Sequence, residues 1–380
     1  MKISIKKIFI FRLLIVSITL VISLVAADYI LGKYVMWDSH KIDSICKDFA
    51  MDKFAESRGF SLVNAFYKPF DRVTHCGLEF NYTYHIDKNG FRYDKDDKKR
   101  KNILTIGDSF TFGFGVKDNE NFASLLHAYN AGMWGNPFDV QFASLKRNIP
   151  LIKPKVIIWG IYPSHIVTMM PHEWSDWCPG DMKYPINAPH SVISGFDNSG
   201  IASYLKKNTS LKSIESKDNA LYILKNCYMT KEVLLYDENL GGNRYTYNEA
   251  VNKTFLKDRD RVYRQLQSYM IQAKKIADKN DAKLYFVLIP SRMQLRLQEG
   301  SYSVTYPESK INANLPTETI TKMIVKAGYE KDSIIDLGTA FSGQPEWREY
   351  YFVTDAHWNA KGHKFVAERI KNILKREEDK

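Results

Sequence analysis

Residues 102–116, with the sequence NILTIGDSFTFGFGV, constrain the fold of this 380-residue chain more than any other segment. The apolar and β-branched residues 103–106 predict a short buried strand. Gly107-Asp108-Ser109 ends this run sharply, and a helical pattern follows from about Asn121. Open α/β sheets bind ligands beside the carboxyl ends of their strands, so Ser109 is a candidate nucleophile. A serine that caps the next helix or turn gives the same pattern, and this segment alone leaves both interpretations open.

A second polar motif precedes the last predicted helix. Asp355 and His357 lie in a loop just before a helix that carries Val366, Ile370 and Ile373 on one face. A neutral imidazole can accept the proton of a serine hydroxyl, and a nearby carboxylate fixes its tautomer and stabilises the imidazolium that forms. An isolated Asp-x-His pair is more often a turn or a surface pair. Its occurrence together with Gly-Asp-Ser after an early strand predicts a catalytic serine, histidine and aspartate.

These two motifs resemble those of the SGNH/GDSL hydrolase superfamily, and the resemblance extends over about residues 102–370. It implies a three-layer α/β/α fold in which helices cover both faces of a flavodoxin-like parallel sheet. It also implies that Ser109 is the nucleophile, that His357 is the general base and then the general acid, and that Asp355 orients His357. No cofactor is implied, and the sequence has no metal-binding motif of the His-Glu-x-x-His type.

The same resemblance implies an oxyanion hole with an incomplete set of donors. Residues 130–135 resemble the second block of the superfamily, whose glycine donates a backbone N–H; we assign this role to Gly135, with Gly132 as the close alternative. The third block, Gly-x-Asn-Asp, is expected after the next strand, but no Asn-Asp occurs there and Ser164 stands at the nearest matching place. The predicted donors are therefore Ser109, Gly135 and Ser164. Loss of one donor typically lowers the rate by roughly 10²–10³-fold, so the protein is expected to be slow, specialised or inactive.

Apolar runs alternate with helical patterns along much of the chain, which predicts a parallel sheet with helices on both faces. The predicted strands are residues 103–106, 140–142, 156–159, 284–289 and 334–337, and the clearest predicted helices are residues 122–129 and 261–279. Residues 33–100 form a lead-in segment that is expected to pack on the main domain, which spans residues 101–380. Residues 170–258 interrupt the alternation and predict an insertion after the third strand.

Several other residues near the predicted site have a structural as well as a functional explanation. Trp174 and Trp177 in the insertion fit either a platform for sugar rings or a small local core, and we favour the local core. We expect His165 to cap the preceding loop rather than to act in the site. Trp358 is expected to pack beside His357.

The N-terminal residues 1–32 predict that the folded part is exported. Residues 1–12 are basic, and residues 13–27 are mostly apolar. A signal peptide cleaved after Ala27 fits this pattern, and so does an uncleaved anchor over about residues 8–31; we favour the anchor. The expected location is the inner (cytoplasmic) membrane, with a single pass and the catalytic domain outside the cytoplasm. Secretion to the periplasm is the alternative.

The four cysteines fit a protein outside the cytoplasm, where an even number permits two disulfides. Pairing neighbours along the chain gives Cys46–Cys76 and Cys178–Cys227, and buried free thiols are the alternative. No two of them have the C-x-x-C spacing that is typical of zinc sites, so we expect no metal.

The formal net charge of +11 suits an acidic polysaccharide or an anionic lipid surface as a partner. No basic stripe interleaved with aromatic residues indicates nucleic-acid binding. Two functions fit the sequence. The first is an exported serine esterase or O-acyltransferase that acts on acyl groups of a cell-envelope glycan or a small ester. The second is a glycan-binding or assembly-scaffold protein on the same fold whose catalysis has decayed. The oligomeric state is not indicated.

Overall fold

The computed structural model describes residues 19–20, 22–23, 58–59, 66–67, 70–76, 80–95, 100–170, 234–236, 238, 249–300, 311–352 and 355–378. The chain divides into two compact units, one of residues 1–47 and 187–225 and the other of residues 48–186 and 226–380. In the first unit the described residues, 19–20 and 22–23, are helical. No helix in the described ranges has both the length and the hydropathy needed to cross a membrane. The predicted anchor lies mostly outside those ranges and stays a prediction.

The second unit contains a five-stranded parallel sheet in the order β6-β5-β7-β8-β9. The strands are β5 (Ile103–Ile106), β6 (Tyr129–Asn130), β7 (Val156–Ile161), β8 (Lys283–Leu288) and β9 (Ile334–Asp336). Numbered from the first strand of this sheet, the order is 2-1-3-4-5, which is the flavodoxin-like order. The predicted fold class and four of the five predicted strands are thereby confirmed.

The predicted strand at residues 140–142 is wrong, because this run lies inside helix α6 (Phe138–Ile152). Its apolar residues belong to a buried helical face rather than to an alternating strand. The second strand is instead β6, only two residues long, at the edge of the sheet. The predicted helix at residues 122–129 is correspondingly shorter: α5 (Phe122–Leu125) ends before His127, whose φ of 57° turns the chain into β6.

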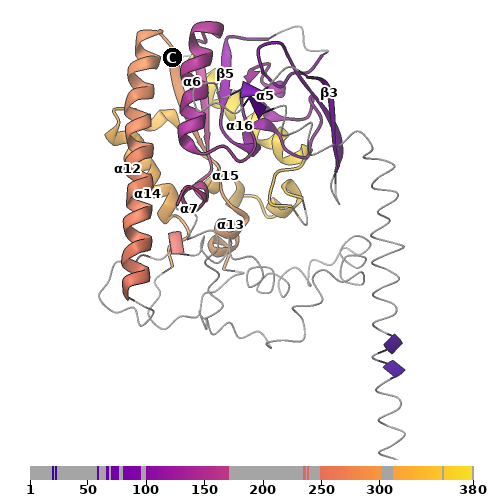
Figure 1. Cartoon of the computed structure of the whole chain (residues 1–380), viewed down its shortest axis with the longest axis vertical. Helices are drawn as coiled ribbons and strands as arrows, with labels where there is room; N and C mark the ends of the chain where they lie inside the picture. The colour runs from indigo at the N-terminus through magenta and orange to yellow at the C-terminus, as the bar shows by residue number, and fades with distance from the viewer. Residues whose placement is uncertain are drawn as a thin grey trace, which may run out of the picture. The chain divides into compact units, whose positions relative to one another are not determined.

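Helices cover both faces of the sheet (Figure 1). Helix α6 packs beside the long helix α12 (Glu249–Lys279), which begins earlier than the sequence predicted, and α12 also contacts β8. Helix α5 packs against α16 (Ala360–Glu378) on the opposite face. The remaining described helices are α4 (Ser109–Phe112), α7 (His165–Thr168), η2 (Leu234–Tyr236), α13 (Arg292–Gln298), α14 (Leu315–Lys326), η4 (Lys331–Ser333), α15 (Leu337–Ser342) and η5 (Trp347–Tyr350).

An antiparallel hairpin precedes the sheet. It consists of β3 (Phe70–Cys76) and β4 (Asn81–Ile86), and single bridges from Ile86 to Arg92 and from Arg92 to Asn130 connect it to the edge strand β6. A separate short pair joins β1 (Arg58–Gly59) and β2 (Phe66–Tyr67). The predicted disulfides stay predictions, because three of the four cysteines lie outside the described residues and the side chain of Cys76 is not described.

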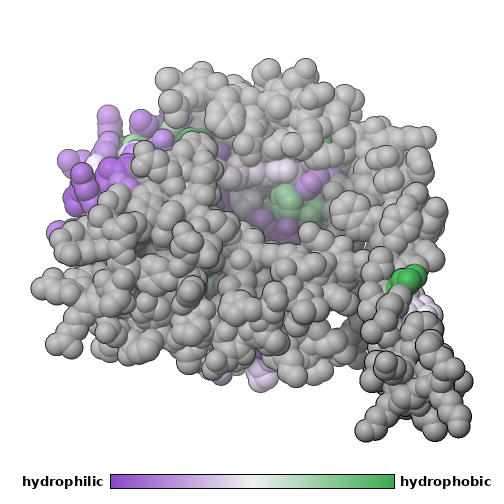
Figure 2. Space-filling model, turned by 60° about the horizontal axis from the view of Figure 1, so that its bottom comes forward, coloured by the Kyte–Doolittle hydropathy of each residue, from purple (hydrophilic) through white to green (hydrophobic). Residues whose placement is uncertain are grey.

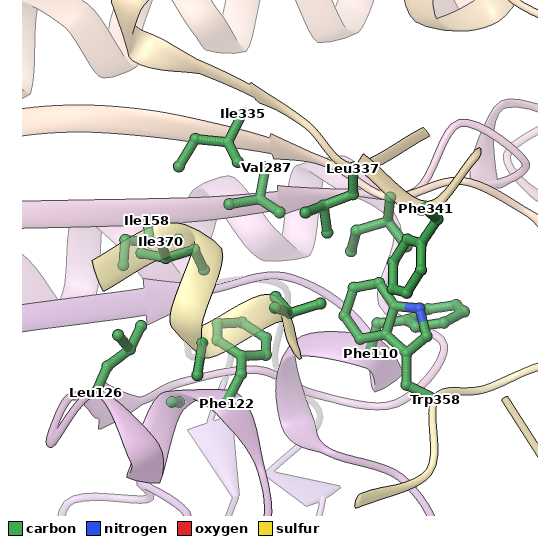
Figure 3. Close-up of a cluster of buried hydrophobic side chains, with 14 of the residues drawn as sticks. Phe110, Phe122, Leu126, Ile158, Val287, Ile335, Leu337, Phe341, Trp358 and Ile370 are labelled. Carbon is green, nitrogen blue, oxygen red and sulfur yellow. The ribbon is translucent and has the colours of Figure 1, made fainter. Parts of the chain in front are cut away.

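A large buried cluster lies between the sheet and helix α16 (Figure 3). Ile158 and Val287 from the sheet pack with Phe110, Trp358 and Ile370, all of which are buried. Fully burying one such side chain stabilises a fold by about 1.5–3 kcal/mol. Phe110 follows Ser109 and Trp358 follows His357 in the chain, so this cluster fixes the backbone on both sides of the predicted site. Trp358 is buried, and its ring packs on Phe110 with centroids 4.8 Å apart, so the prediction that it is a packing residue is confirmed.

His363 on α16 is buried, and its Nδ1 accepts a hydrogen bond from the Phe122 N–H at 3.3 Å. Burial, with the positive charges of Arg92 and His357, lowers the pKa of His363 to about 3. Below pH 6.5, which is its ordinary pKa, His363 therefore binds a proton in the unfolded chain but stays neutral in the folded protein. The free energy of unfolding falls as the pH falls from 6.5 towards 3. By pH 5 the loss in the free energy of unfolding is about 2 kcal/mol.

His363→Gln removes this titrating group. We therefore expect the variant to lose less free energy of unfolding between pH 7 and pH 5 than the wild type does, as measured by urea unfolding. An equal loss contradicts this expectation.

Candidate active site

Ser109 lies at the carboxyl end of β5, as the first residue of helix α4. Asp108 caps this helix, because its Oδ1 accepts a hydrogen bond from the Phe110 N–H at 3.0 Å. Gly107 is required by the tight turn, since a Cβ there would lie 2.1 Å from Thr111 Oγ1 and 3.0 Å from the Gly160 carbonyl oxygen. Ser109 is half-buried while Asp108 and Phe110 are buried. The helix-cap interpretation therefore applies to Asp108, which leaves the serine hydroxyl available for chemistry.

The structure brings Ser109, His357 and Asp355 together. Ser109 Oγ lies 2.6 Å from His357 Nε2, and His357 Nδ1 lies 2.6 Å from Asp355 Oδ1. The same carboxylate oxygen also accepts the His357 backbone N–H at 2.8 Å. An ionised carboxylate can only accept hydrogen bonds. Nδ1 must then carry the ring proton, which leaves Nε2 as the acceptor for the serine hydroxyl.

Arg292, at the start of helix α13, holds the loop that carries the aspartate. Its Nη1 donates to the Phe352 carbonyl oxygen at 3.2 Å and to the Asp355 carbonyl oxygen at 3.4 Å. Burial alone raises the pKa of Asp355, but hydrogen bonds from the His357 ring and backbone, together with the charge of Arg292, bring the pKa below its ordinary value. Asp355 is therefore ionised at neutral pH, as the predicted orienting role requires.

The sequence did not single out Arg292. The one feature of the sequence that could have identified it is its position: Arg292 follows β8, at the same carboxyl edge of the sheet as Ser109.

Two of the three predicted oxyanion donors are the backbone N–H groups of Ser109 and Gly135. In the part of the chain that the structure describes, neither the Ser109 nor the Gly135 N–H donates a hydrogen bond. Gly135 is exposed and has a φ of 58°. Gly132, the alternative donor, is already engaged, because its N–H donates to Asn130 Oδ1 at 3.0 Å. These contacts favour Gly135 over Gly132 as the candidate backbone donor to an oxyanion.

Ser164 and His165 begin helix α7, beside the nucleophile turn. Ser164 has no exposed surface, so its role as a third oxyanion donor stays a prediction. His165 differs from the expectation that it caps its loop: its buried Nε2 lies 3.2 Å from Asp108 Oδ2. The reason is the register of the sheet, which pairs Ile106 with Trp159 and so brings the two following loops together.

Trp174 and Trp177 lie outside the described residues. Within the described ranges, no three His, Cys, Asp or Glu side chains are grouped in a way that could hold a metal ion.

Helices α7 and α13, which follow the carboxyl ends of β7 and β8, lie below helix α6 in Figure 1. Figure 2 brings this side forward, and hydrophobic and hydrophilic residues are visible there side by side. The fold and the site together define an α/β protein with a serine, a histidine and an aspartate hydrogen-bonded in series at the carboxyl edge of its sheet.

No protein-family model matches the chain, and no curated protein matches it either. Among solved structures, TesA is 10% identical with a TM-score of 0.37, over 72% of this chain and 98% of TesA. The psychrotrophic esterase EstA from Pseudoalteromonas sp. is 10% identical with a TM-score of 0.35, over 73% of this chain and 98% of EstA. The acetyl xylan esterase AlAXEase is 11% identical with a TM-score of 0.35, over 71% and 98% of the two chains. Similarity at this level does not establish a shared family or activity.

Proposed function

We propose that this protein is an exported serine esterase or O-acyltransferase of the SGNH/GDSL type, acting on O-acetyl or other acyl groups of a cell-envelope glycan. One observation carries the proposal. Ser109 and His357 are 248 positions apart in the chain, yet Ser109 Oγ and His357 Nε2 lie 2.6 Å apart, with Asp355 on the other ring nitrogen. A serine that only capped a helix would not need an oriented histidine within hydrogen-bond reach of its hydroxyl.

The geometry supports a two-step acyl transfer. Ser109 Oγ attacks the ester carbonyl carbon while His357 Nε2 takes the hydroxyl proton, and the imidazolium is stabilised by the Asp355 carboxylate. The Ser109 and Gly135 N–H groups stabilise the negative oxygen of the tetrahedral intermediate. The intermediate expels the alcohol, which receives the proton from His357, and leaves an acyl-serine. Water or a sugar hydroxyl then attacks this ester, with His357 again acting as base.

The glycan substrate and the location rest on the sequence. The formal charge of +11 favours association with an anionic envelope surface or with a polysaccharide that is anionic as a whole, and it does not specify the charge of the single sugar that carries the acyl group. The basic and apolar N-terminal segment favours attachment to the inner membrane with the site outside the cytoplasm, or else secretion to the periplasm. Within the SGNH/GDSL superfamily, the sequence resembles exported proteins of polysaccharide O-acetylation, and this resemblance points to acetyl groups. Hydrolysis and transfer share the acyl-serine and differ only in what attacks it.

The test is turnover of a chromogenic acetyl ester, combined with labelling by a serine-directed fluorophosphonate. We expect a covalent adduct on Ser109 and a loss of about 10⁴–10⁶-fold in kcat for Ser109→Ala. Ser268→Ala, which removes an exposed serine on α12, serves as the control and should keep wild-type turnover. Undiminished turnover in Ser109→Ala refutes the assignment. Glycan binding without any adduct or turnover favours the decayed scaffold, which the missing Asn-Asp block suggests.

A further inference from the structure

Four half-buried aromatic side chains lie beside His357, and we call them the aromatic wall: Phe80, Phe114, Trp134 and Phe352. The Phe114 ring centroid lies 4.7 Å from that of His357, 4.5 Å from that of Trp134 and 5.2 Å from that of Phe80. Phe80 lies 5.2 Å from Phe352. The wall therefore continues from the general base to the hairpin that precedes the sheet.

The wall differs from the aromatic rings behind it. Phe110, Phe112, Tyr82 and Tyr84 are at most 2% exposed and pack in the core, whereas all four wall residues keep accessible surface. An apolar patch that stays exposed next to a reactive group is typical of a binding site rather than of a core.

The wall is also electrically neutral. His75 on β3 packs against it, with ring centroids 5.0 Å from Phe114 and 4.7 Å from Trp134. Burial lowers the pKa of His75 to about 4, although the charge of Asp355 opposes this shift. His75 is therefore uncharged at neutral pH, and no charged side chain belongs to the wall itself. Arg292 lies beside the wall, but its Nη1 donates to the Phe352 and Asp355 carbonyl oxygens. An anion placed against the ring faces would lose hydration, and none of the four rings carries a charge to compensate for that loss.

We propose that the aromatic wall is the subsite for the alcohol half of the ester, and that it selects an uncharged ring with an apolar face, such as a neutral sugar, over a charged alcohol. This inference rests on the proposed acyl transfer at Ser109. The departing alcohol oxygen must receive the proton from His357 Nε2, so the alcohol half lies on the His357 side of the nucleophile. Phe114 contacts the His357 ring, and the Phe352 N–H donates to the His357 carbonyl oxygen at 3.0 Å. By microscopic reversibility the same surface receives the acceptor alcohol during transfer.

The test compares three acetyl esters: benzyl acetate, ethyl acetate and 4-(acetoxymethyl)benzoate, the last of which adds a carboxylate to the same ring. In wild type we expect kcat/KM for benzyl acetate to exceed the other two by about tenfold. Phe80→Ala and Phe352→Ala should each lower the benzyl-to-ethyl ratio by about fivefold or more. Phe365→Ala removes a half-buried ring of α16 that packs on Tyr350 away from the wall, and it should keep the ratio.

The two wall variants come from different segments, so one of them tests the subsite if the other does not fold. An unchanged ratio in every folded wall variant, with turnover still dependent on Ser109, overturns the subsite and leaves the proposed function standing. Equal kcat/KM for benzyl acetate and its carboxylate in wild type overturns the selection of uncharged alcohols. The absence of both turnover and a fluorophosphonate adduct refutes the proposed function, and the subsite falls with it.

Discussion

Replacing both Ser109 and His357 with alanine is expected to lower kcat no further than either single replacement does. Each single variant should fall by about 10⁴–10⁶-fold, because groups that act as a unit lose most of their effect when one of them is removed. The structural reason is the continuous hydrogen-bonded path from Ser109 Oγ through the His357 ring to Asp355. Hydrolysis of a chromogenic acetyl ester by the wild type, the two single variants and the double variant measures the effect.

Asp355→Asn completes this series. Its amide leaves His357 without a negative partner and permits the wrong ring tautomer, so we expect a fall of about 10⁴-fold. Asp281→Asn is the matched control: this carboxylate is exposed, contacts Lys155 at 2.5 Å and should be dispensable for turnover.

The double variant decides whether Ser109 and His357 act together. If its fall in kcat equals the product of the two single falls, the residues act independently and the shared mechanism is contradicted.

The central strands were predictable because they are buried on both faces and read as unbroken apolar runs. Strand β7, with the sequence VIIWGI, is the clearest case. The strand predicted at residues 140–142 was wrong because a run of three residues cannot distinguish a strand from a helix. The buried positions Phe138, Gln141, Leu145 and Ile149 have helical spacing, but this spacing is visible only over a longer segment. Strand β6 has no periodicity of its own at two residues, and its pairing with β5 defines it.

The three residues of the hydrogen-bonded series were predictable because their motifs are local and lie at the ends of predicted elements. The supporting residues were not. Arg292 acts through backbone carbonyl groups, which leave no side-chain pattern in the sequence. His165 was expected to cap its loop, and only the parallel pairing of β5 with β7 brings it to Asp108. The aromatic wall combines residues from four separate segments of the chain, so it exists only in the folded protein.

Arg92 is the most constrained of these supporting residues, and its side chain has no exposed surface. Its guanidinium donates to Asp118 Oδ1 at 2.8 Å and to the carbonyl oxygens of Phe112 at 2.9 Å, Gly113 at 2.6 Å and Val116 at 2.5 Å. Two of these carbonyls end helix α4, which begins with Ser109. A cation at the carboxyl end of a helix is favourable, so Arg92 fixes α4 at the end opposite to Ser109.

Arg92→Met is therefore expected to lower the free energy of unfolding by about 3–5 kcal/mol, because it removes one member of a buried ion pair and takes a donor from three carbonyl oxygens. Among the described residues, the Asp118 carboxylate then keeps only its contact with His85 Nδ1, at 2.6 Å. Arg100→Met is the control: its pair with Asp87, at 2.9 Å, has side chains 19% and 17% exposed, so water replaces part of the lost contact and a cost near 1 kcal/mol is expected. Arg92→Lys should lie between the two, since an ammonium group cannot reproduce the guanidinium fork. Urea unfolding at pH 7 measures all three. A loss in Arg92→Met no larger than in Arg100→Met shows that the nucleophile helix is held by the aromatic core alone.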